Sequence, residues 1–475
     1  KIQRAAEKAG QDTQKFCDQI SKTFRDLSEI LNLSNTDFIR TTEQRHKNTV
    51  QYIWNELKKN DDIYLSNYSG WYSVSDEAFY NGDEIEEVDG KKIAILSKSP
   101  VEWIEEESYF FRLSKWEKPL LDYYQSNPNF ISPESRKNEV ISFVKSGLKD
   151  LSVSRKSFSW GIPVPDDNNH VIYVWLDALT NYLSALNYPD KNNELFKKFW
   201  PASIHLIGKD ILRFHAIYWP AFLLAAGLPL PEKILAHGHW TVNRVKMSKS
   251  LGNVIDPIDL FETFGVDPVR YFLLRDGSIN NDGDFSLENL ELRRDVELAD
   301  TLGNLLTRAT GKAMLPEGLV LPVPSPAHEL LENDIKLRQS AENLCRVVPE
   351  YYDNFEFGHA ILEIMNVLRE TNRYFQEMEP WTIRKRIKEA KKNGDDISQL
   401  DVQRADTIVY NALEVVRLCT ILLQPIVPEL SNNVLNYLNE GNRGILVVDE
   451  YLWRNGNIKF NGVYGKAFKL IDKEK

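Results

Sequence analysis

Lys246-Met247-Ser248-Lys249-Ser250-Leu251-Gly252-Asn253 is the stretch from which the organisation of this chain can be worked out. It lies between the apolar run Ile234-Leu235-Ala236 and an Asp256-Pro257 turn. Two ammonium groups on one short loop suit a polyphosphate whose charge grows during a reaction, because lysine is a compact and adjustable cation. The serine hydroxyls can donate to phosphate oxygens. A solvated basic turn has the same composition, so the surrounding sequence has to decide.

The composition of the 475 residues is that of a globular protein, with 42% hydrophobic and 27% charged residues. A chain of this length is expected to form roughly two to four domains. The net charge of −11 argues against a protein that coats nucleic acid indiscriminately, but it leaves selective RNA binding through a local basic patch open. No apolar run approaches the roughly 20 residues that a membrane-spanning helix needs.

The three cysteines, Cys17, Cys345 and Cys419, are far apart, which predicts a reducing compartment and no structural zinc site. His237-Gly238-His239 has the spacing of two metal ligands, but no cysteine or clustered carboxylate lies near it, so no metal site is predicted. The segment from Lys1 onward carries neither an initiating methionine nor a secretory signal. We therefore expect a chain that is truncated at its N-terminus.

The periodicity of the apolar residues indicates an α/β layer. Helical spacing covers residues 1–31 with a break at Gly10-Gln11-Asp12, and Phe38-Ile39-Arg40 is predicted to be a short strand. The runs His170–Trp175 and Ser203–Gly208 predict buried strands. Alternation of strands and helices in this rhythm is typical of an α/β fold.

Two segments with other sequence patterns interrupt or follow this layer. From about residue 70, short alternating strands and Gly/Asp-rich turns predict an inserted module that reaches about residue 155. From about Leu302 to Leu438 the pattern is almost wholly helical. The sequence therefore predicts an α/β part that carries an insertion, followed by a helical part.

Polar residues follow both predicted strands, at the edge where open α/β sheets bind ligands. Val174-Trp175-Leu176-Asp177-Ala178 places a large ring and a carboxylate at this edge, although a core Trp with a helix-capping Asp is an equal alternative. In Gly208-Lys209-Asp210 the glycine permits close approach of a ligand, and Asp210 could bind an ammonium group or ribose hydroxyls. His215 on the next helix would by itself be read as a core residue.

A basic helix with an aromatic residue at its head is predicted near the C-terminal end. Trp381 follows Pro380, and the helix carries the basic residues Arg384, Lys385, Arg386, Lys388, Lys391 and Lys392. Such a helix is often a solvated face. The tryptophan makes stacking on a nucleic-acid base possible, which is worth roughly 1–3 kcal/mol per base.

Taken together, these motifs resemble the methionyl-tRNA synthetases of the class I aminoacyl-tRNA synthetases. Lys246-Met247-Ser248-Lys249-Ser250 matches the KMSKS loop of class I, and the more specific matches are Val174–Ala178, Ile207–Asp210 and Phe214–Pro220. The motifs occur in family order, and the resemblance covers essentially the whole chain. It implies a Rossmann-like α/β catalytic domain with an inserted connective module, and a C-terminal α-helical anticodon-binding domain.

The resemblance also implies domain boundaries and a missing segment. The first strand and the HIGH-type ATP loop of the family would precede Lys1, and no His-x-x-His pair replaces them. The chain would then lack part of the ATP site. The implied domains are the first part of the catalytic domain (1–69), the connective insertion (70–155), the second half of the catalytic domain (156–245), the KMSKS loop with a stem-contact region (246–301) and the helical anticodon-binding domain (302–475).

Site residues carry over from the family position by position. The resemblance implies a methionine side-chain pocket formed by Trp175, Ala178, Tyr182, Ile211 and His215. Aromatic walls suit a thioether, because sulfur–aromatic contacts contribute roughly 0.3–1.5 kcal/mol each, and His215 could give the sulfur a weak hydrogen bond. Leu179 stands where the family often has a proline.

The nucleotide and tRNA sites are implied in the same way. ATP would bind through Gly208, Asp210, His237, Lys246, Met247, Ser248, Lys249 and Ser250. Lys246 and Lys249 would be the catalytic residues, because they stabilise the departing pyrophosphate. The CAU anticodon would be read by Asn304, Arg308 and Trp381, with Trp381 stacking on a base and the other two residues bonding base edges.

The activity implied is that of a methionine-tRNA ligase, whose partners are methionine, ATP with Mg²⁺, and tRNA(Met). The insertion lacks Cys-x-x-Cys pairs and resembles the zinc-free type of some bacteria and of mitochondria, so we expect no structural zinc. We expect a monomer in the bacterial cytoplasm, with the mitochondrial matrix as the alternative compartment. Two other functions stay open: a synthetase-derived, non-catalytic tRNA-binding protein, and a related enzyme that uses another amino acid.

Overall fold

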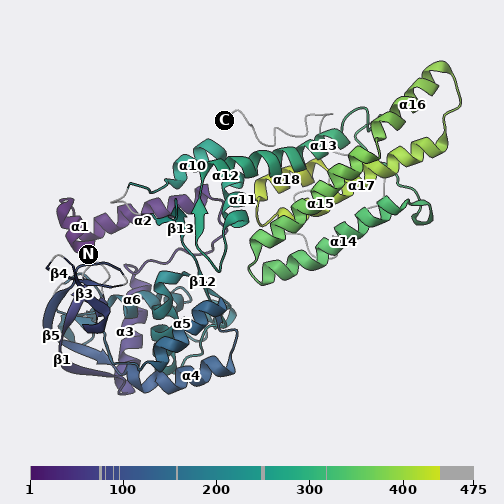
Figure 1. Ribbon diagram of the computed structural model, residues 1–475. Coiled ribbons are helices and arrows are strands. Elements are labelled where there is room, and N and C mark those ends of the chain that lie inside the picture. The colour runs from purple at the N-terminus through teal and green to yellow at the C-terminus, as the bar shows by residue number, and fades with distance from the viewer. Residues whose placement is uncertain are drawn as a thin grey trace. The chain divides into compact units, whose positions relative to one another are not determined.

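The computed structural model describes residues 2–73, 78–80, 82–88, 90–95, 97–156, 159–247, 252–316 and 318–438. The chain forms two compact units, Lys1–His237 and Gly238–Lys475, whose elements are labelled in Figure 1. None of the helices in the described ranges is long and apolar enough to cross a membrane.

The first unit mixes helices with short strands. Its helices are α1 (Ile2–Lys8), α2 (Thr13–Ile30), α3 (Gln44–Lys59), η1 (Gly82–Glu84), η2 (Leu113–Trp116), α4 (Glu117–Ser126), α5 (Glu134–Lys145), α6 (Val174–Leu179), α7 (Asn181–Ser184), α8 (Glu194–Phe199), η3 (Lys209–Ile211), η4 (Phe214–Tyr218) and α9 (Trp219–Ala225). Its strands are β1 (Ile63–Ser73), β2 (Ala78–Tyr80), β3 (Ile85–Val88), β4 (Lys91–Ala94), β5 (Glu102–Phe111), β6 (Ile131–Ser132), β7 (Leu151–Ser152), β8 (Ser154–Arg155), β9 (Pro163–Val164), β10 (Asp167–Ile172), β11 (His205–Gly208) and β12 (Ile234–His237).

A parallel sheet in the order β11-β12-β6 forms the α/β layer. The strand predicted over Ser203–Gly208 is confirmed, since β11 covers His205–Gly208. β6 comes from inside the range 70–155 predicted as an insertion, and yet it pairs with β12. Leu120 of α4 and Val144 of α5 belong to the same buried core as these strands. The helices α4 and α5 therefore pack with the α/β layer.

Two of the predicted strands differ from the structure. Residues 38–40 have no regular secondary structure, so the strand predicted at Phe38–Arg40 is wrong. The run from His170 does form a strand, but β10 ends at Ile172 and pairs antiparallel with β8 and β9. Helix α6 then begins at Val174, where the strand was predicted to continue. A short apolar run does not distinguish a strand from a buried helical turn.

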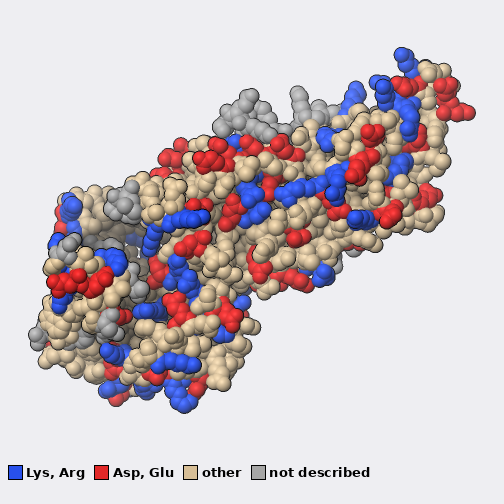
Figure 2. Space-filling view, viewed as in Figure 1, with Lys and Arg blue, Asp and Glu red and all other residues tan. Residues whose placement is uncertain are grey.

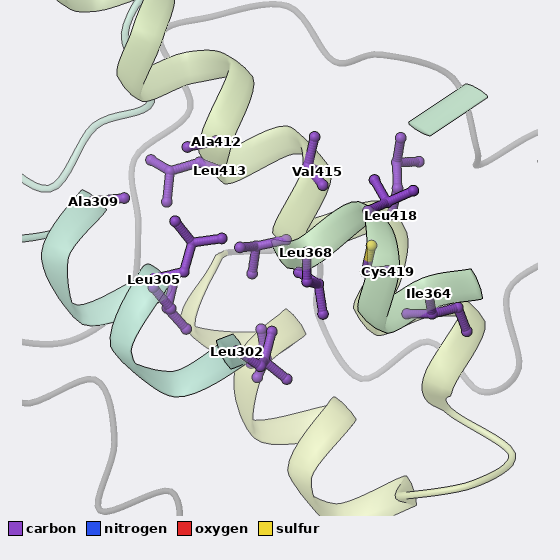
Figure 3. Packing of buried hydrophobic residues seen from close by; sticks show 14 of the residues in the cluster. Leu302, Leu305, Ala309, Ile364, Leu368, Ala412, Leu413, Val415, Leu418 and Cys419 are labelled. Carbon is purple, nitrogen blue, oxygen red and sulfur yellow. The ribbon is translucent and has the colours of Figure 1, made fainter. Parts of the chain in front are cut away.

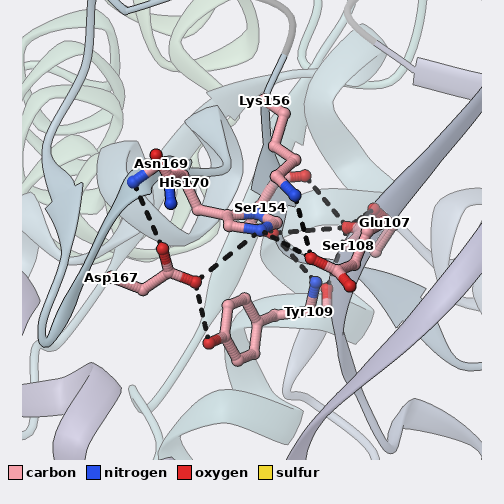
Figure 4. A network of polar contacts seen from close by, with 9 residues as sticks. Glu107, Ser108, Tyr109, Ser154, Lys156, Asp167, Asn169 and His170 are labelled. Carbon is pink, nitrogen blue, oxygen red and sulfur yellow. Dashed lines mark hydrogen bonds and ion pairs between the residues drawn. The ribbon is translucent and has the colours of Figure 1, made fainter.

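The antiparallel part of the first unit is built on a long ribbon in which β1 pairs with β5. A polar network joins β5, β8 and β10 (Figure 4). The buried His170 lies with its Nδ1 2.9 Å from the Ser154 hydroxyl, and its Nε2 is 3.7 Å from carboxylate oxygens of both Glu107 and Asp167. The bond at Nδ1 satisfies one buried ring nitrogen and connects β10 to β8, whereas no hydrogen bond to Nε2 is found among the described residues.

The second unit is mainly helical. Its strands are β13 (Trp240–Val242), β14 (Val245–Lys246) and β15 (Gly283–Phe285). Its helices are α10 (Pro257–Phe264), α11 (Val266–Asp276), α12 (Leu287–Leu292), η5 (Arg293–Gly303), α13 (Asn304–Ala309), η6 (Ala327–Glu329), α14 (Glu332–Asp353), α15 (Phe357–Glu377), α16 (Pro380–Asn393), α17 (Gln399–Leu423) and α18 (Pro428–Tyr437). The helical pattern predicted between Leu302 and Leu438 is confirmed over most of its length.

Leucine-rich faces of these helices form one core. Figure 3 shows Leu302, Leu305, Leu368 and Leu413 directed toward one another between their helices, and all four are at most 1% exposed. Helix ends are set by local signals: the Ser398 side chain accepts from the Asp401 N–H at the start of α17, and Gly394 ends α16 in the left-handed conformation.

A buried carboxylate fixes the start of α18. The Asp267 Oδ2 accepts the Leu430 N–H at 2.6 Å, whereas no hydrogen-bond partner for its Oδ1 is found among the described residues. Burial is the main cause that raises the pKa of Asp267 to about 6, and the nearby Glu429 raises it further. The folded chain therefore binds a proton at Asp267 more readily than the unfolded chain does.

We expect acidification to stabilise the start of α18. The stabilising effect of the neutral carboxyl is fully present below the unfolded-state pKa near 4, and it is lost as the pH rises through about 6. The maximum effect is roughly 3 kcal/mol. Hydrogen exchange of α18, corrected for its intrinsic pH dependence, should show more protection at pH 5 than at pH 7.5. Asp267→Asn should remove the difference and Asp259→Asn, at an exposed carboxylate, should keep it; an Asp267→Asn protein with the wild-type difference would contradict this assignment.

Candidate functional site

The residues predicted to form the methionine pocket come from α6, α7 and the segment η3–η4. The Trp175 ring on α6 stacks on Phe214 with ring centroids 3.7 Å apart, and the His215 ring lies 6.5 Å from Trp175 in an edge-on arrangement. Phe214 and His215 are neighbours on η4, a π-helix over Phe214–Tyr218. Single π-helical turns inside α-helices are frequent at functional sites.

A chain of hydrogen bonds links the other pocket residues. The Tyr182 hydroxyl lies 2.8 Å from His215 Nε2, and His215 Nδ1 lies 3.0 Å from the Ile211 carbonyl oxygen. A carbonyl oxygen can only accept, so Nδ1 carries the proton and Nε2 accepts the Tyr182 O–H. Both ring nitrogens are therefore engaged. To donate a hydrogen bond to a thioether sulfur, His215 would have to give up one of these two partners.

Both polar groups of this chain are neutral near pH 7. Burial lowers the pKa of the His215 imidazole, and the backbone bond to Ile211 only partly offsets that effect. Burial also raises the pKa of the Tyr182 phenol to about 12. A neutral, partly aromatic cluster of side chains suits contact with an uncharged and polarizable group. The structure thus brings Trp175, Tyr182, Ile211 and His215 together through direct contacts.

Ala178 and Leu179 lie on α6, one turn beyond Trp175. The Ala178 carbonyl accepts the Asn181 side-chain amide at 2.5 Å, and the Leu179 side chain is buried. The site residues of this motif therefore lie on a helix and not on a strand, which changes the directions in which their side chains point. Trp175 and Ala178 are three residues apart, so they share one face of α6.

Asp177 has a partner that the sequence pattern does not reveal. Its Oδ1 lies 2.7 Å from Nε2 of His46 on α3, and the His46 Nδ1 lies 2.9 Å from the Ser184 hydroxyl on α7. His46 is fully buried. The contact connects three helices and holds α6 in place, so Asp177 supports the helix that carries Trp175 and Ala178.

Two of the predicted nucleotide residues meet at the end of the parallel sheet. Gly208 on β11 is the register partner of His237 on β12. Asp210 follows in the short helix η3 and its side chain is exposed. The carboxyl ends of parallel strands are where α/β sheets bind ligands. The structure therefore brings Gly208, Asp210 and His237 to one edge of the sheet.

The central glycine of His237-Gly238-His239 has a packing reason. A Cβ atom at Gly238 would lie 2.2 Å from the Asn281 carbonyl oxygen, which no side chain tolerates. Glycine is required wherever two backbones approach so closely. In the part of the chain that the structure describes, no group of three or more His, Cys, Asp or Glu residues could hold a metal ion.

Part of the predicted phosphate loop belongs to the second unit. Lys246 ends β14, where it is the register partner of Thr241, and its side chain is exposed. Its carbonyl oxygen accepts the Asn253 side-chain amide at 3.3 Å, which connects the two ends of the loop. Met247 is half-buried. Ser248, Lys249 and Ser250 lie outside the described residues.

The predicted anticodon residues lie on α13 and α16. The Arg308 guanidinium lies 5.4 Å from the Trp381 ring centroid and 5.4 Å from that of Phe375, and its Nη2 donates to Gln376 Oε1 at 3.0 Å. Asn304 is exposed and precedes Arg308 by one helical turn, so it lies on the same face of α13. The structure thus brings Arg308 and Trp381 together.

Some basic residues of α16 form ion pairs with acidic residues of the same unit, and others are exposed to solvent. Arg384 is ion-paired with Asp406 and Arg386 with Asp401. Figure 2 shows further basic side chains at the end of the helical unit where α16 lies, with acidic side chains next to them. A mixed surface of this kind argues for selective contacts rather than a general polyphosphate surface.

Two models of protein families match the sequence. The model described as tRNA synthetases class I (M) matches residues 1–91 and 84–310. The model described as the anticodon binding domain of methionyl tRNA ligase matches residues 323–449.

Curated relatives and solved structures agree with these matches. The methionine-tRNA ligase of Rickettsia felis is 46% identical over 452 residues, which are 92% of this chain and 82% of that protein. The Mycobacterium tuberculosis ligase is 44% identical over 440 residues, with coverages of 93% and 82%. A crystal structure of M. tuberculosis methionyl-tRNA synthetase bound by methionyl-adenylate has a TM-score of 0.91 at 41% identity, covering 98% of this chain and 89% of that one. The apo form of that enzyme has a TM-score of 0.85 at 40% identity, with coverages of 95% and 87%.

Proposed function

The chain belongs to the methionyl-tRNA synthetases of class I, and from this we propose that the protein acts as a methionine-tRNA ligase through the residues of both units. The methionine carboxylate would attack the α-phosphate of ATP, forming methionyl-adenylate and releasing pyrophosphate. The methionyl group would then pass to the 3′-terminal adenosine of tRNA(Met). Catalysis of this kind relies on positioning and on charge stabilisation, so no side chain has to act as a nucleophile.

The observation that carries the proposal is the neutral cluster of aromatic and hydrogen-bonded side chains around Tyr182 and His215. Trp175, stacked on Phe214, would form one wall for the methionine side chain, and Ala178 and Ile211 would complete the pocket. The thioether sulfur would then meet ring edges and faces, which are favourable surroundings for it.

The nucleotide would lie at the sheet edge where Gly208 and His237 are paired. Gly208 leaves room for close approach, and Asp210 would bind the ammonium group of methionine or the ribose hydroxyls. Lys246 and Lys249 would act on the charge that develops on the departing pyrophosphate, with Met247, Ser248 and Ser250 completing the loop. Mg²⁺ would arrive with the ATP phosphates, because a hard cation prefers their oxygen atoms.

The anticodon would be read by the surface that carries Asn304, Arg308 and Trp381. Stacking of a base on Trp381 is supported by the position of its ring next to Arg308, which can also hold a base edge. We also propose a monomer in the bacterial cytoplasm. The relatives from Rickettsia and Mycobacterium support a bacterial compartment over the mitochondrial matrix.

ATP–pyrophosphate exchange on the full-length protein tests the function directly. We expect exchange that depends on methionine. At equal concentration, the exchange rates with leucine, isoleucine and cysteine should be at least about 10²-fold lower, because each of these side chains would lose packing contacts and polar contacts together.

Equal exchange with another amino acid would refute the methionine pocket. Binding of tRNA(Met) without exchange would favour the alternative of a non-catalytic tRNA-binding protein. A far-UV circular dichroism spectrum and a cooperative thermal unfolding transition, measured on the same preparation, are the control that the protein is folded.

A further inference from the structure

His205 is a buried residue of β11 that contacts Tyr182, one of the residues of the proposed methionine pocket. The Trp219 indole Nε1 donates to His205 Nε2 at 3.1 Å. The imidazole also stacks on the Tyr182 ring, with centroids 3.9 Å apart and an interplanar angle of 21°. No other ring contact of Tyr182 found among the described residues is as close; those with His215 and Trp219 are 5.7 and 6.1 Å.

The protonation of His205 follows from its partners. An indole nitrogen can only donate, so Nε2 is the accepting nitrogen and the proton resides on Nδ1. Burial, with a smaller contribution from His215, lowers the pKa of His205 to about 3. The imidazole is therefore neutral at physiological pH, and it places no charge behind the Tyr182 ring.

Tyr182 is held at two points. Its ring face lies on His205, and its hydroxyl donates to His215 Nε2. A phenol has two side-chain torsions, and these two contacts together restrict both of them. Removing the ring support would leave the hydroxyl contact alone to fix the side chain.

The Tyr182 ring needs the support of His205 because open space lies next to these two residues. Tyr182 and His205 both line a cavity of about 400 Å³, whose other walls include Leu186, Phe199 and Leu206. If the His205 imidazole were removed, the space that it fills would join this cavity, and the Tyr182 ring could tilt into the enlarged space. The tilt would carry the hydroxyl away from His215, because the hydroxyl lies at the far end of the ring and its contact with His215 Nε2 is only 2.8 Å long.

We propose that His205 is a positioning residue for methionine recognition, which holds the Tyr182 ring so that the Tyr182–His215 pair faces the methionine side chain. The inference rests on the proposed function, and it names a residue that would contact no substrate. His205 would act through Tyr182, and it would affect the binding of methionine without affecting that of ATP.

The test uses His205→Ala in the full-length protein and methionine-dependent ATP–pyrophosphate exchange. We expect the KM for methionine to rise about 10-fold, the loss of one well-placed contact, while kcat and the KM for ATP change by less than about 2-fold. The preference for methionine over norleucine should fall, because the pocket loses its fixed shape. His205→Phe restores a ring beneath Tyr182, so its KM for methionine should return to within about 3-fold of the wild-type value.

Two further variants keep the result interpretable. His205→Gln keeps an acceptor for the Trp219 N–H but has no ring, so it should show the raised KM even if His205→Ala does not fold. His170→Ala is the matched control: His170 is equally buried, bonds to Ser154 and lies edge-on to Tyr109, 5.1 Å away. It should lower the melting temperature and leave the KM for methionine unchanged.

An unchanged KM for methionine in His205→Gln would overturn the positioning role. So would a His205→Phe variant that is as impaired as His205→Gln, or equal losses for methionine and ATP in either one. A wild-type protein that shows no methionine-dependent exchange would instead overturn the proposed function, so the two failures are distinguishable.

Discussion

Trp175→Ala is expected to lower kcat/KM for methionine in the exchange reaction by about 10²-fold, corresponding to roughly 3 kcal/mol. The indole is the largest wall of the proposed pocket, and it lies flat on Phe214 with ring centroids 3.7 Å apart. Its removal takes away sulfur and methylene contacts, and it lets Phe214 rotate into the space that methionine would occupy. The KM for ATP should change little, since Gly208 and His237 lie on other elements.

Two variants serve as controls for this experiment. Trp175→Phe keeps an aromatic wall and should retain most of the activity. Trp103→Ala removes a tryptophan that is 56% exposed on β5 of the same unit, and it should leave the exchange kinetics at the wild-type level. A comparable loss of kcat/KM for ATP in Trp175→Ala would show that the unit is damaged as a whole, and the pocket assignment would then fail.

Trp381→Ala should reduce aminoacylation of tRNA(Met) by about 10- to 100-fold and leave methionine-dependent exchange intact. Stacking of one base on an aromatic ring contributes roughly 1–3 kcal/mol, and this loss would apply only to reactions that involve the anticodon. The ring is held near Phe375 at 6.0 Å and near Arg308, so it is already oriented before a base arrives. Charging and exchange would be measured on the same preparation.

Trp381→Phe is the conservative partner, and it should recover a large part of the charging rate because it keeps a stacking surface. An exposed basic residue of the same helix, Lys385, provides a control for charge: Lys385→Ala should have a much smaller effect than Trp381→Ala. Parallel losses in charging and exchange would mean that Trp381 supports the fold of α16 instead of reading a base.

The parts of the fold that could be predicted from the sequence are those set by local chemistry. The break between α1 and α2 falls at Gly10-Gln11-Asp12, where the Asp12 carboxylate accepts the Lys15 N–H as a cap. Gly208 and Asp210 could be placed at a ligand-binding sheet edge because they follow the apolar run that forms β11, whereas the pairing of Gly208 with His237 was not predicted. The strand assigned to Trp175 failed because a run of apolar residues fits a strand and a buried helical turn equally well.

The parts that could not be predicted depend on residues far apart in the sequence. His46 and Asp177 are 131 positions apart and meet only when α3 packs on α6. His205 is a single polar residue in an apolar strand, and its role depends on rings from α7 and α9. β6 is only two residues long, too short to give a pattern, although it joins the parallel sheet.

The π-helical turn over Phe214–Tyr218 makes the length of this segment as important as its composition. A π-helical turn holds one residue more than an α-helical turn, and each residue of an α-helix corresponds to about 100° of rotation. Deleting one residue here would allow a regular α-helix to form, and it would rotate His215 by about 100° relative to Trp219. An alignment gap in this segment would therefore mark the loss of the pocket in a relative, even if every aromatic residue were still present.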